Sequence, residues 1–272
     1  MLRIGWIDYA NCSPIFTALT RHFDCSGYTF VKGVPAELNA MLADGRIDVA
    51  PSSSVEYAMH EERYALMPGL SISSIGPVKS VLLFSRIPID ELDHCNIGLT
   101  SESATSVVLL KILLADMMGF TNQFERTVQS PVEALGRFDA LLLIGDAALK
   151  AALTDHAGYV YDLGALWYQM CNLPFVFALW IVRRDAIAER YDEVSRLWRD
   201  LSAAKEIARR EYAEIASSCT SREWLGLDDL IAYWNTISYD LGNEHLEGLK
   251  RYYQHAVGLG ILDRPPEIRF FE

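Results

Sequence analysis

Short apolar runs alternate with segments of helical periodicity over the first two-thirds of the chain. Such alternation is typical of an α/β fold whose strands are largely parallel. The apolar runs predict strands at residues 3–7, 28–32, 48–50, 78–85, 96–99, 124–128, 140–144, 159–161 and 175–182. Helices are expected to fill the gaps between these strands.

The expected helices carry recognisable boundary signals. Pro35 stands at the start of one helix and Gly45 directly after its end, which is the order that helices favour. A second helix is expected over residues 103–118, where apolar residues recur at helical spacing until Gly119. Beyond residue 185 the pattern changes to charged amphipathic helices at residues 185–217, 228–238 and 243–257, for which we expect a role in structural packing.

Two extended segments, residues 81–88 and 175–183, flank a middle stretch that has its own alternating pattern. We interpret them as crossovers between two lobes. Lobe 1 then combines residues 1–86 and 180–272, including the C-terminal helices, and lobe 2 comprises residues 87–179. A ligand is expected in the cleft between the lobes.

The charge balance narrows the choice of ligand. The chain has 24 Lys+Arg against 36 Asp+Glu, a formal net charge of -12, which disfavours binding to nucleic acid. The same field repels a small anion at long range, so a carboxylate ligand would have to be held by local donors in a shielded cleft. No obligate protein partner is evident.

The N-terminus, the longest apolar segment and the cysteines are typical of a cytoplasmic protein. The N-terminus meets Asp8 before any signal-peptide run develops, and the longest apolar segment, residues 175–182, is far shorter than the ~20 residues that span a bilayer. We therefore expect no membrane contact and read this segment as a buried strand. The five cysteines are scattered without a Cys-x-x-Cys pair and the histidines lack metal spacing, so reduced thiols and no metal site are expected.

Polar residues follow several predicted strands, where open α/β sheets bind ligands. Asp8 and Asn11 follow the first strand, and the alternative is an ordinary turn in which Asn or Ser caps a helix. Ser52 and Ser53 follow the strand that ends at Ala50, and their hydroxyls either cap a helix or donate to a carboxylate.

A loop with hydroxyls and Gly76 is expected over residues 71–80, with Ser80 at the start of the next strand. The alternative for Ser80 is a surface strand position. Asp146 follows another apolar strand and either orients a ligand hydroxyl or, as is favoured, caps a helix. Trp167, Phe175 and Phe177 either wall the cleft or belong to the core.

The turn over residues 100–106 gives the strongest local signal. Its hydroxyl residues include Thr100, Ser103, Thr105 and Ser106, and they precede or begin the helix at residues 103–118. Free amide groups at a helix start, together with hydroxyls, form a cradle for an anion without a lysine or arginine, although such turns also serve simply as caps. No Ser-His-Asp arrangement, phosphate loop or pair of catalytic carboxylates emerges, so the residues indicate a two-lobed binder of a small anion.

The run over residues 3–11, followed by Ser13, Pro14 and Ile15, resembles the N-terminal signature of chorismate dehydratase from the futalosine route to menaquinone. Further blocks resemble that family in the same order, at residues 45–50, 53–57, 71–76, 80–85, 99–106, 143–149 and 173–180. Their joint order is more specific than any single block. One departure is Cys171-Asn172, where the family usually has Thr-Gly.

The resemblance implies the periplasmic-binding-protein type II fold, in agreement with the two-crossover interpretation. It implies a hydro-lyase that converts chorismate to 3-[(1-carboxyvinyl)oxy]benzoate without a cofactor, the substrate's own enolpyruvyl carboxylate acting as base. By the same resemblance Asn11 and Ser80 are the catalytic residues, which position that carboxylate and the departing hydroxyl. The expected substrate-binding residues are Asp8, Ser52, Ser53, Gly76, Thr100, Ser103, Thr105, Ser106 and Asp146.

Two alternatives stay open. One is the related 1,4-dihydroxy-6-naphthoate synthase of the same route, which the segment over residues 8–15 fits poorly. The other is a solute-binding or sensor protein, because this fold usually binds ligands without chemistry. The missing signal peptide argues against the transport version.

Overall fold

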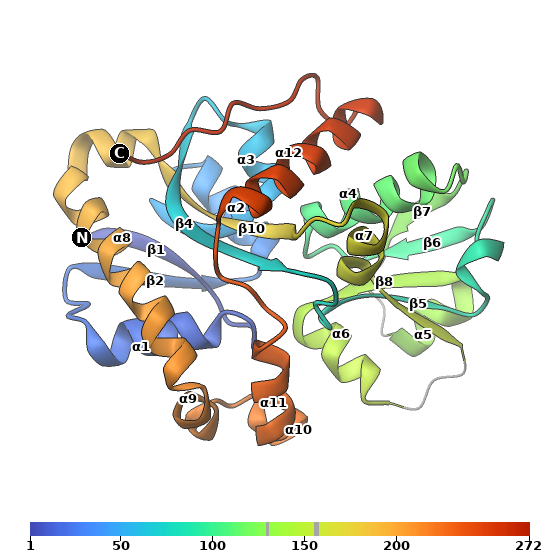
Figure 1. Ribbon diagram of the computed structural model, residues 1–272, viewed down its shortest axis with the longest axis horizontal. Coiled ribbons are helices and arrows are strands. Elements are labelled where there is room, and N and C mark those ends of the chain that lie inside the picture. Colours follow the sequence, from blue (N-terminus) through green and yellow to red (C-terminus); the bar gives the residue numbers. More distant parts are fainter. Residues whose placement is uncertain (129–130, 155–157) are drawn as a thin grey trace.

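The computed structural model describes residues 1–128, 131–154 and 158–272. Two lobes lie side by side, each built around a five-stranded sheet (Figure 1). Both chain ends lie in the first lobe (Figure 1). The predicted two-lobed α/β fold is confirmed.

The sheet of the first lobe has the order β2-β1-β3-β10-β4. Its strands are β1 (Leu2–Ile7), β2 (Tyr28–Gly33), β3 (Val49–Ser53), β4 (Tyr64–Ser74) and β10 (Phe175–Arg183). β1 pairs in parallel with β2 and β3, whereas β10 runs antiparallel to β3 and β4. The connecting helices are α1 (Ser13–His22), α2 (Pro35–Ala43) and α3 (Ser54–Met59).

The sheet of the second lobe has the order β7-β6-β8-β5-β9. Its strands are β5 (Val81–Ser85), β6 (Asn96–Leu99), β7 (Gln123–Arg126), β8 (Ala140–Ile144) and β9 (Tyr159–Asp162). The helices are α4 (Ala104–Lys111), which continues into a π-helical segment (Ile112–Met117), α5 (Pro131–Arg137), α6 (Gly145–Ala152) and α7 (Leu163–Cys171), and a 3-10 turn covers Ile89–Glu91.

The crossings between the lobes differ from the prediction. β5 was expected in the first lobe, yet its buried apolar residues pair with β8 on one side and β9 on the other, so residues 81–85 belong to the second sheet. β10 belongs to the first sheet from Phe175 onward. The chain therefore crosses once through residues 75–80, here called the first crossing, and returns through α7.

The strand β4 was missed, and the loop expected over residues 71–80 is wrong at its beginning. Pro68 and Gly69 interrupt the apolar run, and serines follow it, so the local pattern is typical of a loop. Tertiary contacts override it. β4 pairs with β10 along most of its length, and Ser71 and Ser73 donate side-chain hydrogen bonds to backbone carbonyls of the C-terminal segment.

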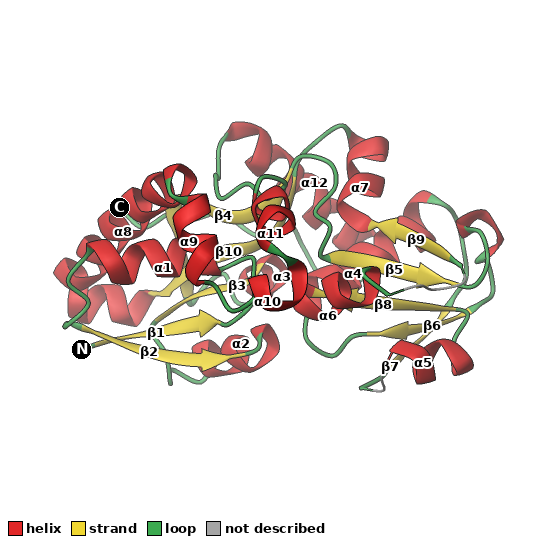
Figure 2. Ribbon diagram, turned by 90° about the horizontal axis from the view of Figure 1, so that it is seen from below, coloured by secondary structure: helices red, strands yellow, loops and turns green. Residues whose placement is uncertain are grey.

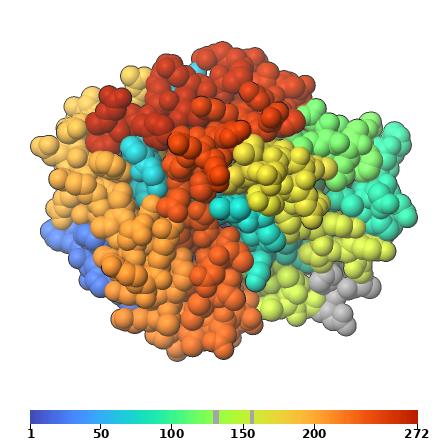
Figure 3. Space-filling model, viewed as in Figure 1, coloured from blue at the N-terminus to red at the C-terminus, as the bar shows by residue number. Residues whose placement is uncertain are grey.

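The C-terminal helices are α8 (Arg184–Arg210), α9 (Tyr212–Ser218), α10 (Arg222–Leu225), α11 (Leu227–Trp234) and α12 (Asn243–Gly258). α8 packs on α1 in the first lobe (Figure 2). α12 also reaches the second lobe, where the Tyr252 hydroxyl donates to the carbonyl of Thr105 at 3.3 Å. C-terminal residues consequently cover the middle of one face (Figure 3). None of the helices in the described ranges is long and apolar enough to cross a membrane.

Candidate active site

A cavity lies between the two sheets. Its lining residues in the first lobe are Ile7, Tyr9, Asn11, Pro35, Ser53, Ile72, Phe177 and Ala178. The first crossing and the second lobe contribute Val78, Ser80, Val81, Ser103, Ser106, Ile144 and Gly145. Ile7, Ser53 and Ile144 are the last residues of β1, β3 and β8, so the cavity lies at the carboxyl ends of these strands.

The cavity brings together a subset of the residues predicted from the sequence. Both expected catalytic residues, Asn11 and Ser80, line it, as do the expected binding residues Ser53, Ser103 and Ser106. These side chains come from strand ends and helix starts that are far apart in the sequence. Their polar groups are amides and hydroxyls, set in walls of aliphatic and aromatic side chains.

Asn11 offers a free acceptor. Its Oδ1 atom is buried and has no hydrogen-bond partner within the described ranges. The backbone around it is fixed from the C-terminal segment, because Trp234 Nε1 donates to the Ala10 carbonyl at 2.7 Å and the Tyr239 hydroxyl donates to the Asn11 carbonyl at 2.6 Å. The N-cap of α1 is Cys12, with no side-chain cap, so Asn11 is not used as a helix cap. A buried polar atom left without a partner calls for an explanation, and a bound ligand supplies one.

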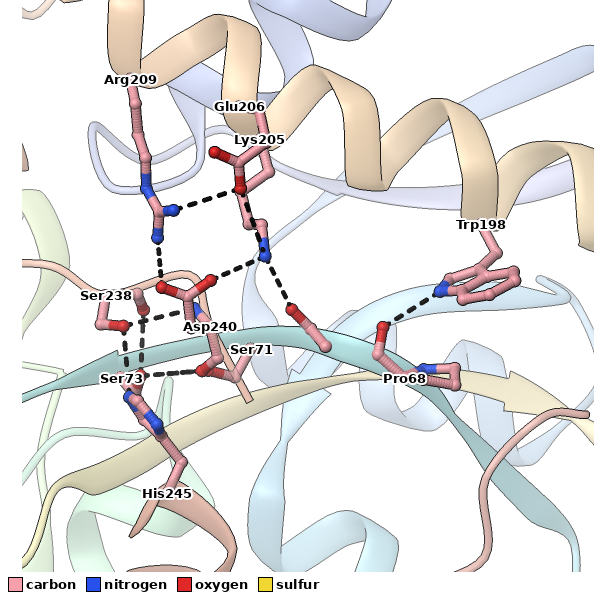
Figure 4. A network of polar contacts seen from close by, with 11 residues as sticks. Pro68, Ser71, Ser73, Trp198, Lys205, Glu206, Arg209, Ser238, Asp240 and His245 are labelled. Carbon is pink, nitrogen blue, oxygen red and sulfur yellow. Dashed lines mark hydrogen bonds and ion pairs between the residues drawn. The ribbon is translucent and has the colours of Figure 1, made fainter. Parts of the chain in front are cut away.

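The two residues that flank Tyr239 in the chain, Ser238 and Asp240, belong to a polar network (Figure 4). On one side of Tyr239, Ser238 exchanges two backbone hydrogen bonds with Ser73 of β4, both 2.8 Å long. On the other side, the Asp240 carboxylate accepts from Lys205 at 2.7 Å and contacts Arg209, both on α8. The position of the Asn11 turn therefore depends on C-terminal residues that the sequence assigned to packing alone.

Ser103 and Ser106 occupy the first turn of α4. Ser103 is the N-cap residue, and its Oγ accepts from the Ser106 amide at 3.2 Å while its hydroxyl donates to Ser106 Oγ at 3.0 Å. Helix capping and anion binding, the two functions considered from the sequence, are thus compatible, because the capping residues also face the cavity. The positive end of the α4 dipole favours an anion here.

Three of the predicted binding residues serve local structure and do not line the cavity. Asp8 is exposed and forms an ion pair with Lys32 at 2.8 Å. Thr100 accepts from the Glu102 amide at 3.2 Å through Oγ1 and so shapes the turn before α4. Gly76 has a φ of 84° and its carbonyl accepts from Ser74 Oγ at 2.8 Å.

Ser52 and Thr105 also lie outside the cavity. Ser52 is fully buried within β3, and its hydroxyl has no partner among the described residues. β3 extends to Ser53, so adjacent residues face opposite sides of the sheet and only Ser53 reaches the cavity. Thr105 Oγ1 accepts from the Val55 amide at 3.2 Å and therefore ties α4 to the start of α3.

Asp146 neither caps a helix nor lines the cavity. It lies inside the first turn of α6, and its Oδ1 accepts from the Ala10 amide of the other lobe at 3.0 Å. Burial raises the pKa of its carboxyl group, whereas the hydrogen bond from Ala10 acts in the opposite direction. Asp146 thus links the second lobe to the turn that carries Asn11.

Tyr9 is a cavity residue that sequence reasoning did not single out. Its hydroxyl donates to Glu102 Oε2 at 2.8 Å, and its ring lies against Gly145, so the side chain joins both lobes. Burial and the bond to Glu102 raise the pKa of Tyr9, which keeps the hydroxyl protonated. The sequence signal that could have identified Tyr9 is its place in the turn between β1 and α1, beside Asn11. Phe177 also lines the cavity, whereas Phe175 and Trp167 do not and pack against each other instead.

The electrostatics of the cavity rest on neutral groups. Among the described residues, no lysine, arginine or carboxylate lines it. Within the same ranges no group of three or more histidine, cysteine, aspartate or glutamate side chains is placed to hold a metal ion. Hydroxyls, an amide and the α4 start can orient a small anion whose ring packs on the apolar walls.

This arrangement defines the class of two-lobed α/β proteins with a periplasmic-binding-protein-like fold. A protein of known structure from Archaeoglobus fulgidus has a TM-score of 0.77 at 19% identity, covering 96% of this chain and 98% of that one. The periplasmic aliphatic sulphonate binding protein from Escherichia coli has a TM-score of 0.69 at 14% identity, covering 100% of this chain and 92% of that one.

Sequence comparison narrows the class to a family. The sequence model described as menaquinone biosynthesis matches residues 2–257, and the chain belongs to that family. It is 36% identical to the chorismate dehydratase of Thermus thermophilus, covering 94% of this chain and 95% of the relative. It is 34% identical to the chorismate dehydratase of Campylobacter jejuni, covering 94% of this chain and 98% of that relative. The resemblance seen in the sequence is thereby confirmed.

Proposed function

We propose that the protein is a hydro-lyase that dehydrates chorismate to 3-[(1-carboxyvinyl)oxy]benzoate in menaquinone biosynthesis, in the cytoplasm. The observation that carries the proposal is the cavity between the lobes, which Asn11, Ser80 and the two serines at the start of α4 all line. Two chorismate dehydratases, each more than 30% identical over nearly the whole chain, give the substrate.

The main requirement that the reaction places on the protein is the orientation of the substrate's reacting groups. A ring C–H bond breaks, its electron pair forms the new ring double bond, and the neighbouring hydroxyl leaves with the proton as water. The product is aromatic, which supplies the driving force, so holding the reacting groups in place lowers the barrier. The cavity lining lacks a carboxylate or imidazole within the described ranges, which supports the substrate's enolpyruvyl carboxylate as the base.

Each polar group then has a separate task. We assign the α4 start, with Ser103 and Ser106, to a substrate carboxylate, because the helix dipole and the hydroxyls favour an anion there. Asn11 and Ser80 together are assigned to position the enolpyruvyl carboxylate and the departing hydroxyl. The apolar walls would exclude water from the ring and strengthen these neutral contacts.

Purified protein mixed with chorismate, without added metal or cofactor, tests the proposal. The expected result is loss of chorismate with formation of an aromatic acid lighter by one water, measured by ultraviolet absorption and mass spectrometry. A sample without protein controls for spontaneous decay. Chorismate that stays intact over a range of pH would refute the activity.

Two other outcomes separate the alternatives. Thermal stabilisation by chorismate without turnover would favour a binding or sensor protein, since a ligand that binds only the folded state raises its stability. The naphthoate alternative has support from a Thermus thermophilus 1,4-dihydroxy-6-naphthoate synthase, which is 25% identical and covers 99% of this chain and 98% of the relative. Consumption of that enzyme's substrate, and not of chorismate, would favour it.

A further inference from the structure

Asp162 is a partly buried carboxylate outside the cavity that receives more hydrogen bonds than its place in the fold requires. It ends β9 and is the N-cap residue of α7, where its Oδ1 accepts from the Ala165 amide at 3.0 Å. Capping needs no more than this bond. Yet the same carboxylate also accepts from the Val78 amide at 3.0 Å and from the Lys79 amide at 2.6 Å.

These two amides belong to the turn of the first crossing directly before Ser80. Lys79 has a φ of 63°, a left-handed conformation that costs a residue with a side chain about 1 kcal/mol or more. The Asp162 carboxylate accepts from the amides of two successive peptides, Pro77–Val78 and Val78–Lys79, and so holds in place the turn that leads into Lys79. On the far side of the turn, the Ser80 carbonyl accepts from the Gly145 amide at 2.8 Å.

A second contact joins the crossings at the same place. A Cβ atom on Gly164, in the first turn of α7, would lie 2.6 Å from the Gly76 carbonyl oxygen and 2.8 Å from Ser74 Oγ. The backbones of the two crossings therefore touch directly. Ser80 is consequently held between the start of α7 on one side and the start of α6 on the other.

Burial raises the pKa of Asp162, while the hydrogen bonds from the backbone amides of Lys79, Ala165 and Val78 act in the opposite direction. Burying a carboxylate is costly unless its hydrogen bonds are satisfied. A serine or asparagine would cap α7 equally well at lower cost. Helix capping alone therefore leaves the second carboxylate oxygen unexplained.

We infer that Asp162 is a positioning residue, which sets the Ser80 hydroxyl against the substrate by clamping the Val78–Lys79 turn of the first crossing to α7. The inference rests on the proposed role of Ser80 in chorismate dehydration. It adds a residue at the start of α7 that lies outside the cavity and acts only through the backbone of the first crossing.

Asp162→Asn and Asp162→Ser test the inference, because both keep a cap for α7 and remove the carboxylate from the turn. We expect kcat to fall about 10- to 100-fold, as displacing a reacting group by an ångström does, while KM changes by less than about threefold. Asp93→Asn is the matched control, because Asp93 also accepts from two backbone amides, those of His94 at 3.0 Å and Thr121 at 2.8 Å. Asp93 precedes the first residue of β6 and does not line the cavity. The kcat of Asp93→Asn should match wild type.

A double-mutant cycle separates positioning from general destabilisation. If Asp162 acts through Ser80, Asp162→Asn lowers kcat by less than about twofold in a Ser80→Ala background but keeps its full effect in an Asn11→Ala background. Equal losses in both backgrounds would show a general structural effect and overturn the inference.

Hydrogen exchange gives a readout that does not depend on turnover. The Val78 and Lys79 amides should exchange at least about tenfold faster in Asp162→Ser than in wild type or Asp93→Asn. If wild-type protein leaves chorismate intact, the proposed function fails, yet this exchange still tests the clamp. Unchanged exchange at Lys79 in a folded Asp162 variant would overturn it.

Discussion

Gly145 is the residue at which several constraints on the cavity meet. Its φ of 58° is left-handed, its amide donates to the Ser80 carbonyl at 2.8 Å, and a Cβ atom here would lie 2.8 Å from two ring carbons of Tyr9. Only glycine satisfies the conformation and the close approach together. One position thus fixes both the Ser80 turn and the side chain that joins the lobes.

Gly145→Ala should lower kcat/KM by about tenfold or more, because it displaces the Tyr9 ring and disturbs the bond to Ser80. Gly119→Ala is the control, since Gly119 is also left-handed at φ 76° but has open space around it. Both variants should lose about 1 kcal/mol of stability from backbone strain in thermal unfolding. Equal steady-state activity of the two variants would contradict the role given to Gly145.

The sequence predicts individual site residues best where a strand ends and a helix begins. Asn11, Ser53 and Ser103 were found in this way, because a rule about sheet edges applies to each of them separately. Asp146 and Thr105 were assigned to the ligand, but each bonds a backbone amide of the other lobe. Such contacts depend on how the lobes meet, which no local pattern records.

At the scale of elements, the C-terminal segment supports the site as well as the core. Tyr239 follows α11 and reaches across the first lobe to the Asn11 carbonyl, while α12 contacts the second lobe. The amphipathic pattern predicted the C-terminal helices, although not this contact, because one buried hydroxyl does not change the periodicity. The β4 strand was missed for a related reason, since its pairing with β10 outweighs Pro68 and Gly69.

Tyr239→Phe should lower kcat while leaving the fold intact. The change leaves the Asn11 carbonyl without its 2.6 Å hydrogen bond, at a cost of about 1–3 kcal/mol, and frees the turn that carries the amide. Tyr57→Phe is matched to it, because Tyr57 is also fully buried and donates to a carbonyl, that of Glu267, at 2.7 Å. The Tyr57 hydroxyl also accepts from the Arg269 amide at 2.8 Å, so Tyr57→Phe should lose at least as much stability as Tyr239→Phe, without loss of kcat. If both variants retain wild-type kcat, the bracing role of Tyr239 is wrong.

At the scale of the whole molecule, the net charge of -12 and the neutral cavity act against each other on an anionic ligand. The long-range field repels a dianion, whereas hydroxyls, an amide and a helix start attract it at short range. The two-lobed architecture was predicted correctly because two extended segments flank a middle stretch that has its own alternating pattern. The residues at which the chain crosses between the lobes were predicted wrongly, since β5 pairs with β8 and β9 within the second sheet.

The KM for chorismate should fall a few-fold as potassium chloride rises from about 20 to 200 mM, because salt screens the repulsion between protein and substrate. The turnover number should stay constant, since the contacts in the cavity are neutral and shielded. An increase in KM with salt would instead reveal a lysine or arginine that contacts the substrate, contrary to the site described above.

The most direct test of the central claim is the turnover number for chorismate in wild type, Asn11→Ala and Ser80→Ala, with folding checked by thermal unfolding. The two residues come from different parts of the chain and share one cavity. Each substitution is expected to lower kcat about 100-fold or more, the usual effect of removing one placed hydrogen-bonding group from an active site. Wild-type turnover in both folded variants would contradict the claim that neutral groups from the two lobes act together on the substrate.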